Sequence, residues 1–467
     1  MLATHSAIYL LGRIVPGAIN LVCITIFAKT LGAEAYGNYA IAIASVGLLT
    51  SFFVQWPVVS VGRYCAEVKA VAEKEYLISA GVLSLGVSLF VGAIIFVFYF
   101  QDKLPPRLLA FVLAISAMQA WFELNLKIMN AFLNAKLYVF SGFLKSSLIF
   151  VFASCSVMLG YGLEGILLSV LLGLFFATLL TNQVSFVFSK KAFDFQLIRK
   201  MFFYGFPVSV SIGMIFLIDA SDRFLIAYFL GLDAVGKYSS IYDLTQQTLG
   251  VLLGVVHLVI LPAVLKAHDD KDKEKAKTLL NNGIFMLFFL GVPSVIGMGL
   301  LSDNIVSVFL GERFAEDTYV MPYIAFSIFL SCLKSFYLDY AFQLAKQMSR
   351  MIVVSMGGLL VNVALNFLLI PIYGILGAAI AACCAFGVCL ILSFILGRSL
   401  YILPFPVFKI FSVILAGVLM ALVLSLVSHW QGVGALLLQI CLGFVLFGFC
   451  ILVINREYIT LIKRVVW

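Results

Sequence analysis

Charged residues are scarce in this chain: aspartate, glutamate, lysine and arginine make up 11% of its 467 residues, whereas hydrophobic residues make up 63%. Soluble globular domains carry about 25% charged residues. The longest polar interruption, residues 265–278, is too short to fold by itself. The composition excludes a soluble protein, and the recurring apolar stretches of 18 or more residues predict a polytopic membrane protein.

Sequence signatures of common enzymes are also absent. The chain contains no GxxxxGK[ST] phosphate-binding loop, no HExxH metal motif and no GxSxG nucleophile elbow. The nine cysteines are scattered, and their spacing indicates neither a metal site nor a disulfide framework. We therefore expect no enzyme, no metal and no bound cofactor. In a membrane chain the net charge of +8 does not by itself indicate nucleic-acid binding, and we expect none.

Apolar stretches long enough to cross a bilayer recur along the whole chain and predict fourteen transmembrane helices. Basic residues crowd alternate connecting loops, 19 on one side of the membrane against four on the other. Because lysine and arginine accumulate in cytoplasmic loops, this bias predicts that both termini are cytoplasmic and that the lysine-rich run 266–277 is a solvated cytoplasmic loop. The expected spans are 7–30, 36–60, 76–100, 107–133, 138–159, 163–188, 200–229, 237–263, 279–301, 319–344, 350–370, 374–396, 404–427 and 433–454.

Three pairs of short segments match between the two halves of the chain. LGAEAYGNY (31–39) matches LGLDAVGKY (230–238), AFLNAK (131–136) matches AFQLAK (341–346), and LGYGLEG (159–165) matches PIYGILG (371–377). Matching segments are separated by six spans. Since six is an even number, the two halves have the same orientation and are expected to be related by a pseudo-two-fold axis along the membrane normal.

This repeat predicts an all-α polytopic membrane protein with two parallel six-helix repeats that form two lobes. We expect an N-lobe over residues 1–190, a C-lobe over residues 191–399, and helices 13 and 14 with a cytoplasmic tail over residues 400–467. Such an architecture is typical of transporters that bind substrate between the lobes. Duplication that merely builds a larger bundle is the alternative.

Five basic residues lie well within the expected spans: Arg13, Lys127, Lys145, Arg223 and Lys334. A charge at the centre of a membrane helix costs about 2.5–3.5 kcal/mol on insertion scales, so each base needs a partner or a function. Phosphate binds arginine through paired hydrogen bonds and lysine as a point charge. These residues are therefore candidates to bind an anionic substrate in a hydrated cavity, and purely structural roles are the alternative.

Four acidic residues accompany these bases: Glu123, Asp219, Asp222 and Asp339. Glu123 stands four residues before Lys127, and Asp219 stands four residues before Arg223, so each pair shares a helix face. Arg13, Lys145 and Lys334 have no obvious acid one turn away. The acids are candidates to bind a coupling ion or to balance charge, and structural ion pairs that lock the bundle are the alternative for both pairs.

These features together resemble the polysaccharide-unit flippases, the Wzx-like exporters of O-antigen and exopolysaccharide units, which belong to the multidrug/oligosaccharidyl-lipid/polysaccharide (MOP) exporter superfamily. The resemblance covers essentially the whole chain. By match to the seventh-span motif, Asp222 and Arg223 carry over as functional residues. The stretches that carry the resemblance are LGAEAYGNYAIAIA (31–44), SVGRYCAE (60–67), YGFPVSVSIGMIFLIDASDRFLIAYFLGLDAVGKYS (204–239) and LLVNVALNFLLIPIYGILGAAIAA (359–382).

The resemblance implies movement of an undecaprenyl-diphosphate-linked oligosaccharide from the inner to the outer leaflet of a bacterial cytoplasmic (inner) membrane. Alternating access of the two lobes would carry the head group, coupled to a proton or sodium gradient or to the membrane potential. In the related lipid II flippases, helices 13 and 14 form a groove for the lipid tail. The implied partners are the lipid-linked substrate, membrane lipids, and the polysaccharide polymerase and chain-length machinery, and a monomer suffices.

Three other functions remain open at the level of sequence. A multidrug antiporter for organic cations would favour an acid-dominated cavity, whereas bases are at least as numerous here. A lipid II flippase of the same superfamily shares the architecture. A polysaccharide polymerase or ligase would need a large external loop, and the longest external segment expected here is residues 302–318.

Overall fold

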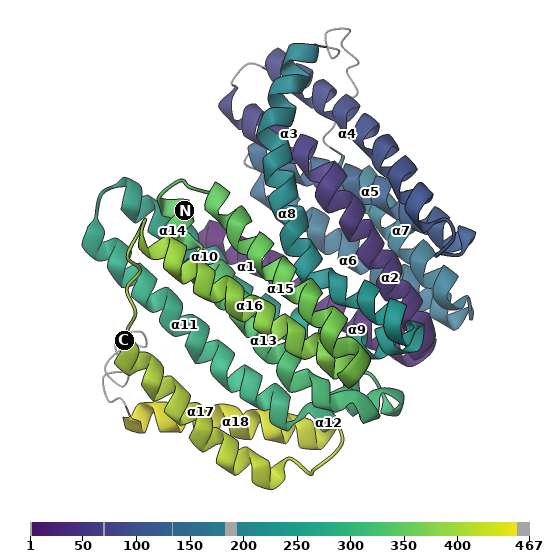
Figure 1. The fold of residues 1–467 in the computed structure, drawn as a ribbon. Helices are drawn as coiled ribbons and strands as arrows, with labels where there is room; N and C mark the ends of the chain where they lie inside the picture. Colours follow the sequence, from purple (N-terminus) through teal and green to yellow (C-terminus); the bar gives the residue numbers. More distant parts are fainter. Residues whose placement is uncertain (1, 69–70, 133, 183–193, 455–467) are drawn as a thin grey trace. The chain divides into compact units, whose positions relative to one another are not determined.

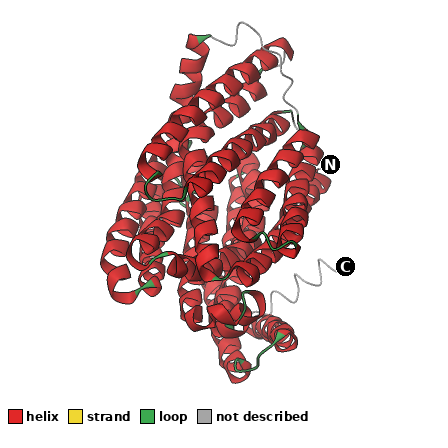
Figure 2. Ribbon diagram, turned by 90° about the vertical axis from the view of Figure 1, so that its right-hand side faces the viewer, coloured by secondary structure: helices red, strands yellow, loops and turns green. Residues whose placement is uncertain are grey.

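The computed structural model describes residues 2–68, 71–132, 134–182 and 194–454, and these residues form helices without any strand (Figure 2). Within this described part, fourteen helical segments are long and apolar enough to cross a membrane. The prediction of an all-α, multi-pass membrane protein is therefore confirmed. The uninterrupted spans are α1 (Leu2–Leu31), α4 (Val71–Phe100), α5 (Pro106–Ala131), α6 (Ala135–Met158), α7 (Gly162–Thr181), α8 (Phe195–Leu230), α11 (Lys273–Leu300), α15 (Ser349–Tyr373), α16 (Ile375–Arg398), α17 (Val407–Val427) and α18 (Val433–Ile454).

Three further spans are each interrupted by one π-helical turn. In such a turn the backbone N–H bonds to the carbonyl five residues earlier, which inserts one extra residue and offsets the two halves of the span. Hydropathy and residue spacing do not reveal these turns, because a π-helical turn changes the backbone hydrogen bonds without changing the composition of the span. The interrupted spans are α2–η1–α3 (Ala33–Leu49, Thr50–Val54, Gln55–Glu67), α9–η3–α10 (Leu232–Thr245, Gln246–Gly250, Val251–Asp269) and α13–η5–α14 (Met321–Leu333, Lys334–Leu338, Tyr340–Leu344).

The two repeats share the backbone geometry of their turns. The first repeated turn contains Gly32 with φ 75° and ψ 177°, and its counterpart contains Gly231 with φ 88° and ψ 179°. Helix α7 begins at Gly162, which has φ 55°, and the turn before α16 contains Gly374 with φ 60°. L-residues with a side chain rarely adopt such positive φ values, so each turn requires glycine. The repeat read from the sequence is thus matched by repeated turn geometry.

The first turns of α2 and α9 approach each other through a reciprocal glycine contact. A Cβ atom added to Gly37 would lie 2.0 Å from the carbonyl oxygen of Leu232, and a Cβ atom added to Gly236 would lie 1.7 Å from the carbonyl oxygen of Ala33. Gly37 and Gly236 are equivalent positions of the repeat, and so are Ala33 and Leu232. The contact therefore has two equivalent halves, in which the glycine of each helix faces the first carbonyl oxygen of the other helix.

The contacts of the chain divide it into two compact units, Met1–Gly236 and Lys237–Trp467. This division falls later than the repeat boundary expected near residue 190, because α8 packs against α3 in the first unit. Ser60 donates a hydrogen bond of 2.7 Å to the carbonyl oxygen of Met201, and Ser209 donates one of 2.8 Å to that of Ser51. Met201 is fully buried among apolar residues of α3, α4 and α5. The boundaries at 190 and 399 describe the repeat and stay a prediction.

In the second unit, α17 and α18 pack beside α11, as Figure 1 shows in green to yellow. The short helix α12 (Ser302–Phe309) and the 3-10 segment η4 (Glu312–Val320) precede α13. Asn304 of α12 donates a hydrogen bond of 2.9 Å to Gln439 of α18, and Gln439 donates one of 2.7 Å to the carbonyl oxygen of Val427. This buried amide pair attaches the last two helices to the six-helix repeat.

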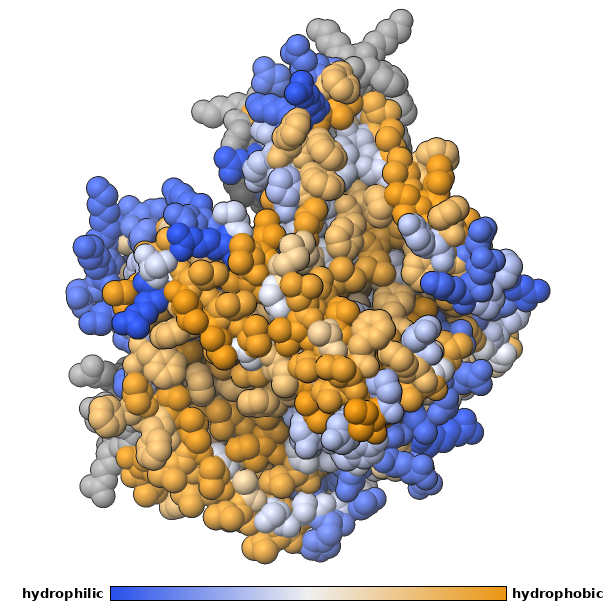
Figure 3. Space-filling view, viewed as in Figure 1, coloured by the Kyte–Doolittle hydropathy of each residue, from blue (hydrophilic) through white to orange (hydrophobic). Residues whose placement is uncertain are grey.

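Apolar side chains cover broad areas of the face seen in Figure 3, and polar residues gather near helix ends and turns. On α17 and α18 the exposed residues are almost all apolar, including Phe408 at 90% exposure and Phe444 at 73%. Such surfaces suit lipid contact, since lipid tails are as apolar as these side chains.

Candidate functional site

In the first unit, α5 presents a polar line that holds the acid Glu123. Gln55 donates a hydrogen bond of 2.6 Å to one oxygen of the Glu123 carboxylate, and Gln119 donates one of 2.8 Å to the other. Gln55 begins α3 directly after the π-helical turn η1, so that turn positions the amide. Lys127, which the sequence placed one turn from Glu123, is exposed and lies along Gly62 of α3. The two glutamine amides, rather than Lys127, are the partners of this carboxylate.

Lys145 of α6 lies next to this carboxylate-bearing helix. Its Nζ is 5.1 Å from the centroid of the Phe122 ring on α5, and the side chain is half-buried. A lysine above an aromatic face gains about 0.5–1 kcal/mol at exposed sites and more when desolvated. The amine is thus positioned by an aromatic ring rather than by a carboxylate. Phe122 and Glu123 are neighbours in sequence, so α5 and α6 together present an acid and a base.

Helix α8 carries Asp219, Asp222 and Arg223 on one face, as the spacing predicts. Asp222 is buried at 1% exposure, whereas Asp219 and Arg223 are half-buried. All three interact with other residues. A carboxylate this buried in a membrane span needs polar neighbours, which agrees with a stripe that packs inside the protein. The side chain of Arg13 on α1 lies outside the described part of the chain.

In the second unit, Lys334 has a partner that the sequence analysis missed. Its Nζ lies 2.9 Å from a carboxylate oxygen of Asp339, and the two side chains are 4% and 2% exposed. Ser393 of α16 donates a hydrogen bond of 3.0 Å to the other oxygen of that carboxylate. The N–H of Asp339 bonds to the carbonyl oxygen of Lys334 at 2.9 Å, closing the π-helical turn η5. This turn brings residue i+5 over residue i, whereas a regular α-helix would bring residues i+3 and i+4 there.

Aromatic residues of the same span extend this cluster. His257 of α10 lies 2.9 Å from the Tyr340 hydroxyl through its Nδ1, and its ring lies 4.7 Å from that of Phe336. The Tyr337 hydroxyl donates to the carbonyl oxygen of Pro404, in the linker before α17. The sequence analysis did not select these tyrosines, since isolated tyrosines in an apolar span give no spacing signal.

The two units differ in whether their intramembrane lysines are paired with a carboxylate. In the first unit, Lys145 and the exposed Lys127 are cations that lack a carboxylate contact among the described ion pairs. In the second unit, Lys334 and Asp339 neutralise each other in a buried pair. Across the described residues, no group of three histidine, cysteine, aspartate or glutamate side chains could hold a metal ion. The arrangement can bind an anion or a proton through side chains alone.

Known proteins resemble this chain in sequence and in fold. The profile of the family described as polysaccharide biosynthesis protein matches residues 26–318. A putative O-antigen transporter of Shigella flexneri is 23% identical over 396 residues, which cover 80% of this chain and 92% of that protein. A probable low-salt glycan biosynthesis flippase of Haloferax volcanii is 26% identical over 230 residues, which cover 49% of this chain and 48% of that protein.

Among solved structures, the lipid II flippase MurJ in an inward closed conformation superposes with a TM-score of 0.78. The superposition covers 98% of this chain and all of that chain at 16% sequence identity, so it establishes the fold and leaves the substrate open. The matched segment of the family profile spans more than half of the present sequence. This chain therefore belongs to the polysaccharide biosynthesis protein family.

Proposed function

We propose that this protein carries an undecaprenyl-diphosphate-linked oligosaccharide repeat unit from the inner to the outer leaflet of a bacterial cytoplasmic membrane. The family match over residues 26–318 carries the proposal, supported by the transporter relative of which this chain covers 92%. A diphosphate with sugars cannot cross about 30 Å of hydrocarbon unaided, because each unpaired polar group costs several kcal/mol there. Alternating access would let protein groups replace water while the lipid tail stays in the bilayer.

Binding of the diphosphate head group requires basic side chains that are not already paired with a carboxylate. Lys145 meets this requirement best, since its amine is positioned by the Phe122 ring 5.1 Å away and makes no carboxylate contact among the described ion pairs. Lys127 is exposed on the same polar line of α5. We also retain Arg13 and Arg223 as candidate phosphate ligands. Lys334 becomes a structural residue in this proposal, because Asp339 already neutralises it at 2.9 Å.

Coupling to an ion gradient is assigned to acids of the first unit. Glu123 accepts two amide hydrogen bonds, and protonation of either carboxylate oxygen would remove an acceptor from Gln55 or Gln119. Protonation can thus change the contact between α3 and α5. Asp219 and Asp222 are the further candidates on α8. Collapsing the proton or the sodium gradient separately in cells that accumulate the lipid-linked unit distinguishes the two ions.

The remaining proposals concern placement and partners. The excess of basic residues in alternate loops supports an orientation with both termini in the cytoplasm. We propose that the chain acts as a monomer without a cofactor and delivers its product to the polysaccharide polymerase and chain-length machinery. Cysteine labelling at residues 266–277 from outside intact cells tests the orientation, because labelling there would invert it.

The decisive experiment is complementation of a strain deleted for this gene, following surface polysaccharide and the lipid-linked repeat unit. Wild type is expected to restore surface polymer, whereas the deletion leaves the repeat unit on the inner leaflet. Lys145→Gln is expected to lower transport at least tenfold at normal protein level. Lys103→Gln is the matched control, since Lys103 is exposed outside the spans.

Two outcomes would replace the proposal with the other exporter functions. Unchanged surface polysaccharide with altered drug sensitivity would indicate a multidrug antiporter. Failure of cell-wall synthesis with intact surface polysaccharide would indicate a lipid II flippase. If Lys145→Gln transported as well as wild type, the assignment of Lys145 as a phosphate ligand would be wrong, even if the protein were a flippase.

A further inference from the structure

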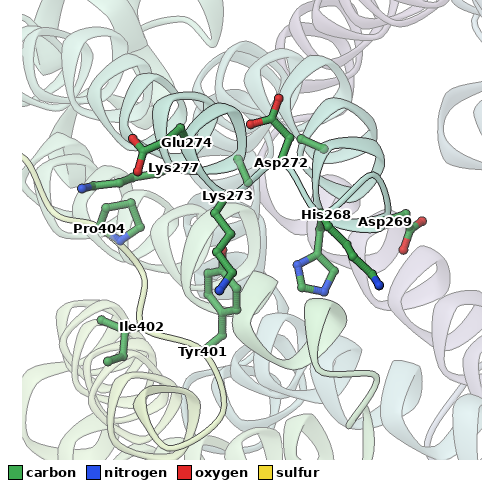
Figure 4. A pocket seen from close by; sticks show the side chains of 12 residues that line it. His268, Asp269, Asp272, Lys273, Glu274, Lys277, Tyr401, Ile402 and Pro404 are labelled. Atoms are coloured by element: carbon green, nitrogen blue, oxygen red, sulfur yellow. The ribbon is translucent and has the colours of Figure 1, made fainter.

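A cavity of about 710 Å³ lies in the second unit, away from the intramembrane charges described above. It is open on one side and is bounded by the turn that joins α10 to α11 and by the linker that joins α16 to α17 (Figure 4). Small-molecule sites typically measure about 300–1,000 Å³. The cavity is therefore large enough for a lipid headgroup. Its lining residues are Ala267, His268, Asp269, Lys271, Asp272, Lys273, Glu274, Ala276, Lys277, Tyr401, Ile402 and Pro404.

The position of the cavity relative to the spans places it at the level of lipid headgroups. The span ending at Asp269, the span beginning at Lys273, the span ending at Arg398 and the span beginning at Val407 all have this end beside the cavity. Helix ends of membrane spans lie where hydrocarbon gives way to headgroups. On the orientation proposed above, this is the cytoplasmic side, where lysine-rich loops meet anionic lipids.

Cationic side chains reach into this cavity. Figure 4 shows the Lys273 amine extending toward Tyr401, while the carboxylate of Asp272 points to the opposite side. Asp272 caps α11 by accepting a hydrogen bond of 3.0 Å from the N–H of Lys275. Lys277 lies one turn after Lys273, on the same face of α11 and beside Pro404 in the figure. Although the formal charges of the lysines and acids in the lining balance, the two α11 lysines are directed toward the linker.

The other wall of the cavity is apolar and continues into an exposed apolar rim. Ile402 is 78% exposed, Phe405 54% and Phe408 90%. The wall is held in place by two contacts: the ring centroids of His268 and Tyr401 lie 5.9 Å apart, and Pro404 accepts the Tyr337 hydrogen bond. A cavity that receives the side chains of Lys273 and Lys277 and has an apolar rim at a helix end matches a ligand that has an anionic head and an apolar tail.

We propose that this cavity binds the phosphate-bearing headgroup of an anionic membrane lipid, with Lys273 and Lys277 as the phosphate ligands and Ile402 and Phe405 against the acyl chains. A lysine near an anionic membrane surface contributes about fivefold in affinity. The site is separate from the transported substrate, and its occupancy fixes the linker to the α10–α11 turn. Through Tyr337 the same linker contacts the turn that holds Lys334.

The test measures binding to the purified full-length protein in a neutral detergent. The probes are dihexanoyl phosphatidylglycerol, dihexanoyl phosphatidylcholine and inorganic phosphate. Wild type is expected to bind the anionic lipid, with Lys273→Gln and Lys277→Gln each weakening it about fivefold and the double variant about thirtyfold. Lys275→Gln is the control, because Lys275 is exposed on the same helix and does not line the cavity.

Three results would overturn this assignment. Equal affinity of the variants and wild type would remove the lysines from the site. Equal affinity for the phosphatidylcholine probe would show that the anionic charge is not recognised. Inorganic phosphate binding as tightly as the lipid, with the same dependence on Lys273 and Lys277, would assign the site to a soluble phosphate. Because the measurement uses no transport, it stands or fails independently of the flippase proposal.

Discussion

Replacement of Gly236 by alanine is expected to destabilise the protein, although alanine is the better helix former. Gly236 lies inside α9, where Gly→Ala normally stabilises a helix by about 0.5–1 kcal/mol. The added Cβ would lie 1.7 Å from the Ala33 carbonyl oxygen, whereas ordinary contact begins at 3.4 Å. The first turns of α2 and α9 would have to separate by roughly that difference, and overpacking of this kind costs about 1–3 kcal/mol. The steric cost exceeds the gain in helix propensity.

The assay is the apparent unfolding midpoint of purified protein in detergent, with helix glycines that face open space as controls. Gly142 of α6 and Gly448 of α18 have nothing within 4 Å of an added Cβ. Gly142→Ala and Gly448→Ala are expected to raise the midpoint or leave it unchanged, and Gly236→Ala is expected to lower it. Since Gly37→Ala opens the same contact, the double variant should cost less than the two single changes added together. A midpoint for Gly236→Ala that moves with the controls, or strict additivity, would refute the reciprocal contact.

Two further predictions concern charged residues. Asp339→Asn leaves the Lys334 amine buried without a countercharge, which is expected to destabilise the protein by about 3–5 kcal/mol. In the same unfolding assay, the double variant Lys334→Met/Asp339→Leu should recover most of this loss, because it removes both charges. Equal loss in the single and the double variant would contradict the structural ion pair. Asp194 lies outside the spans, and the 2.8 Å hydrogen bond from Tyr76, followed by the backbone N–H of Leu197, holds the pKa of its carboxyl below the usual range. The stability that this carboxylate contributes is therefore present above the ordinary aspartate pKa and is lost as the pH falls through the lowered pKa. Tyr76→Phe should flatten the acid limb of a plot of stability against pH. An unchanged acid limb would contradict the role of the Tyr76 hydrogen bond.

The elements that sequence could predict are those set by local composition. A span needs about 20 apolar residues whatever surrounds it, so all fourteen spans were found from hydropathy alone. The repeated turns were found because Gly32 and Gly231 occupy backbone conformations that exclude other residues. The α8 stripe followed from helical spacing, since Asp219, Asp222 and Arg223 lie within one uninterrupted helix.

The parts that sequence could not predict depend on irregular backbone or on contacts between helices. Lys334 was assigned no acidic neighbour, because a π-helical turn changes the spacing that brings Asp339 to it. Helical spacing predicts Lys127, four residues away, as a partner of Glu123, yet the amides of Gln55 and Gln119 donate to its two oxygens. Gln55 lies on α3, far away in sequence. The cavity beside the α10–α11 turn is lined by segments more than a hundred residues apart, so no local sequence pattern predicts it.

The reciprocal glycine contact also bears on how this sequence is free to change. In a contact between two identical copies, each substitution acts at two places, whereas in one fused chain the equivalent positions can change separately. Around the contact they have done so: Glu34, Tyr36 and Asn38 correspond to Asp233, Val235 and Lys237. Gly37 and Gly236 have stayed alike, since each still faces a carbonyl oxygen of the opposite helix. The flanking positions can thus differ between the two turns, even at the buried pair Tyr36 and Val235, while the duplicated glycines remain coupled and neither can change alone without opening the contact that both share.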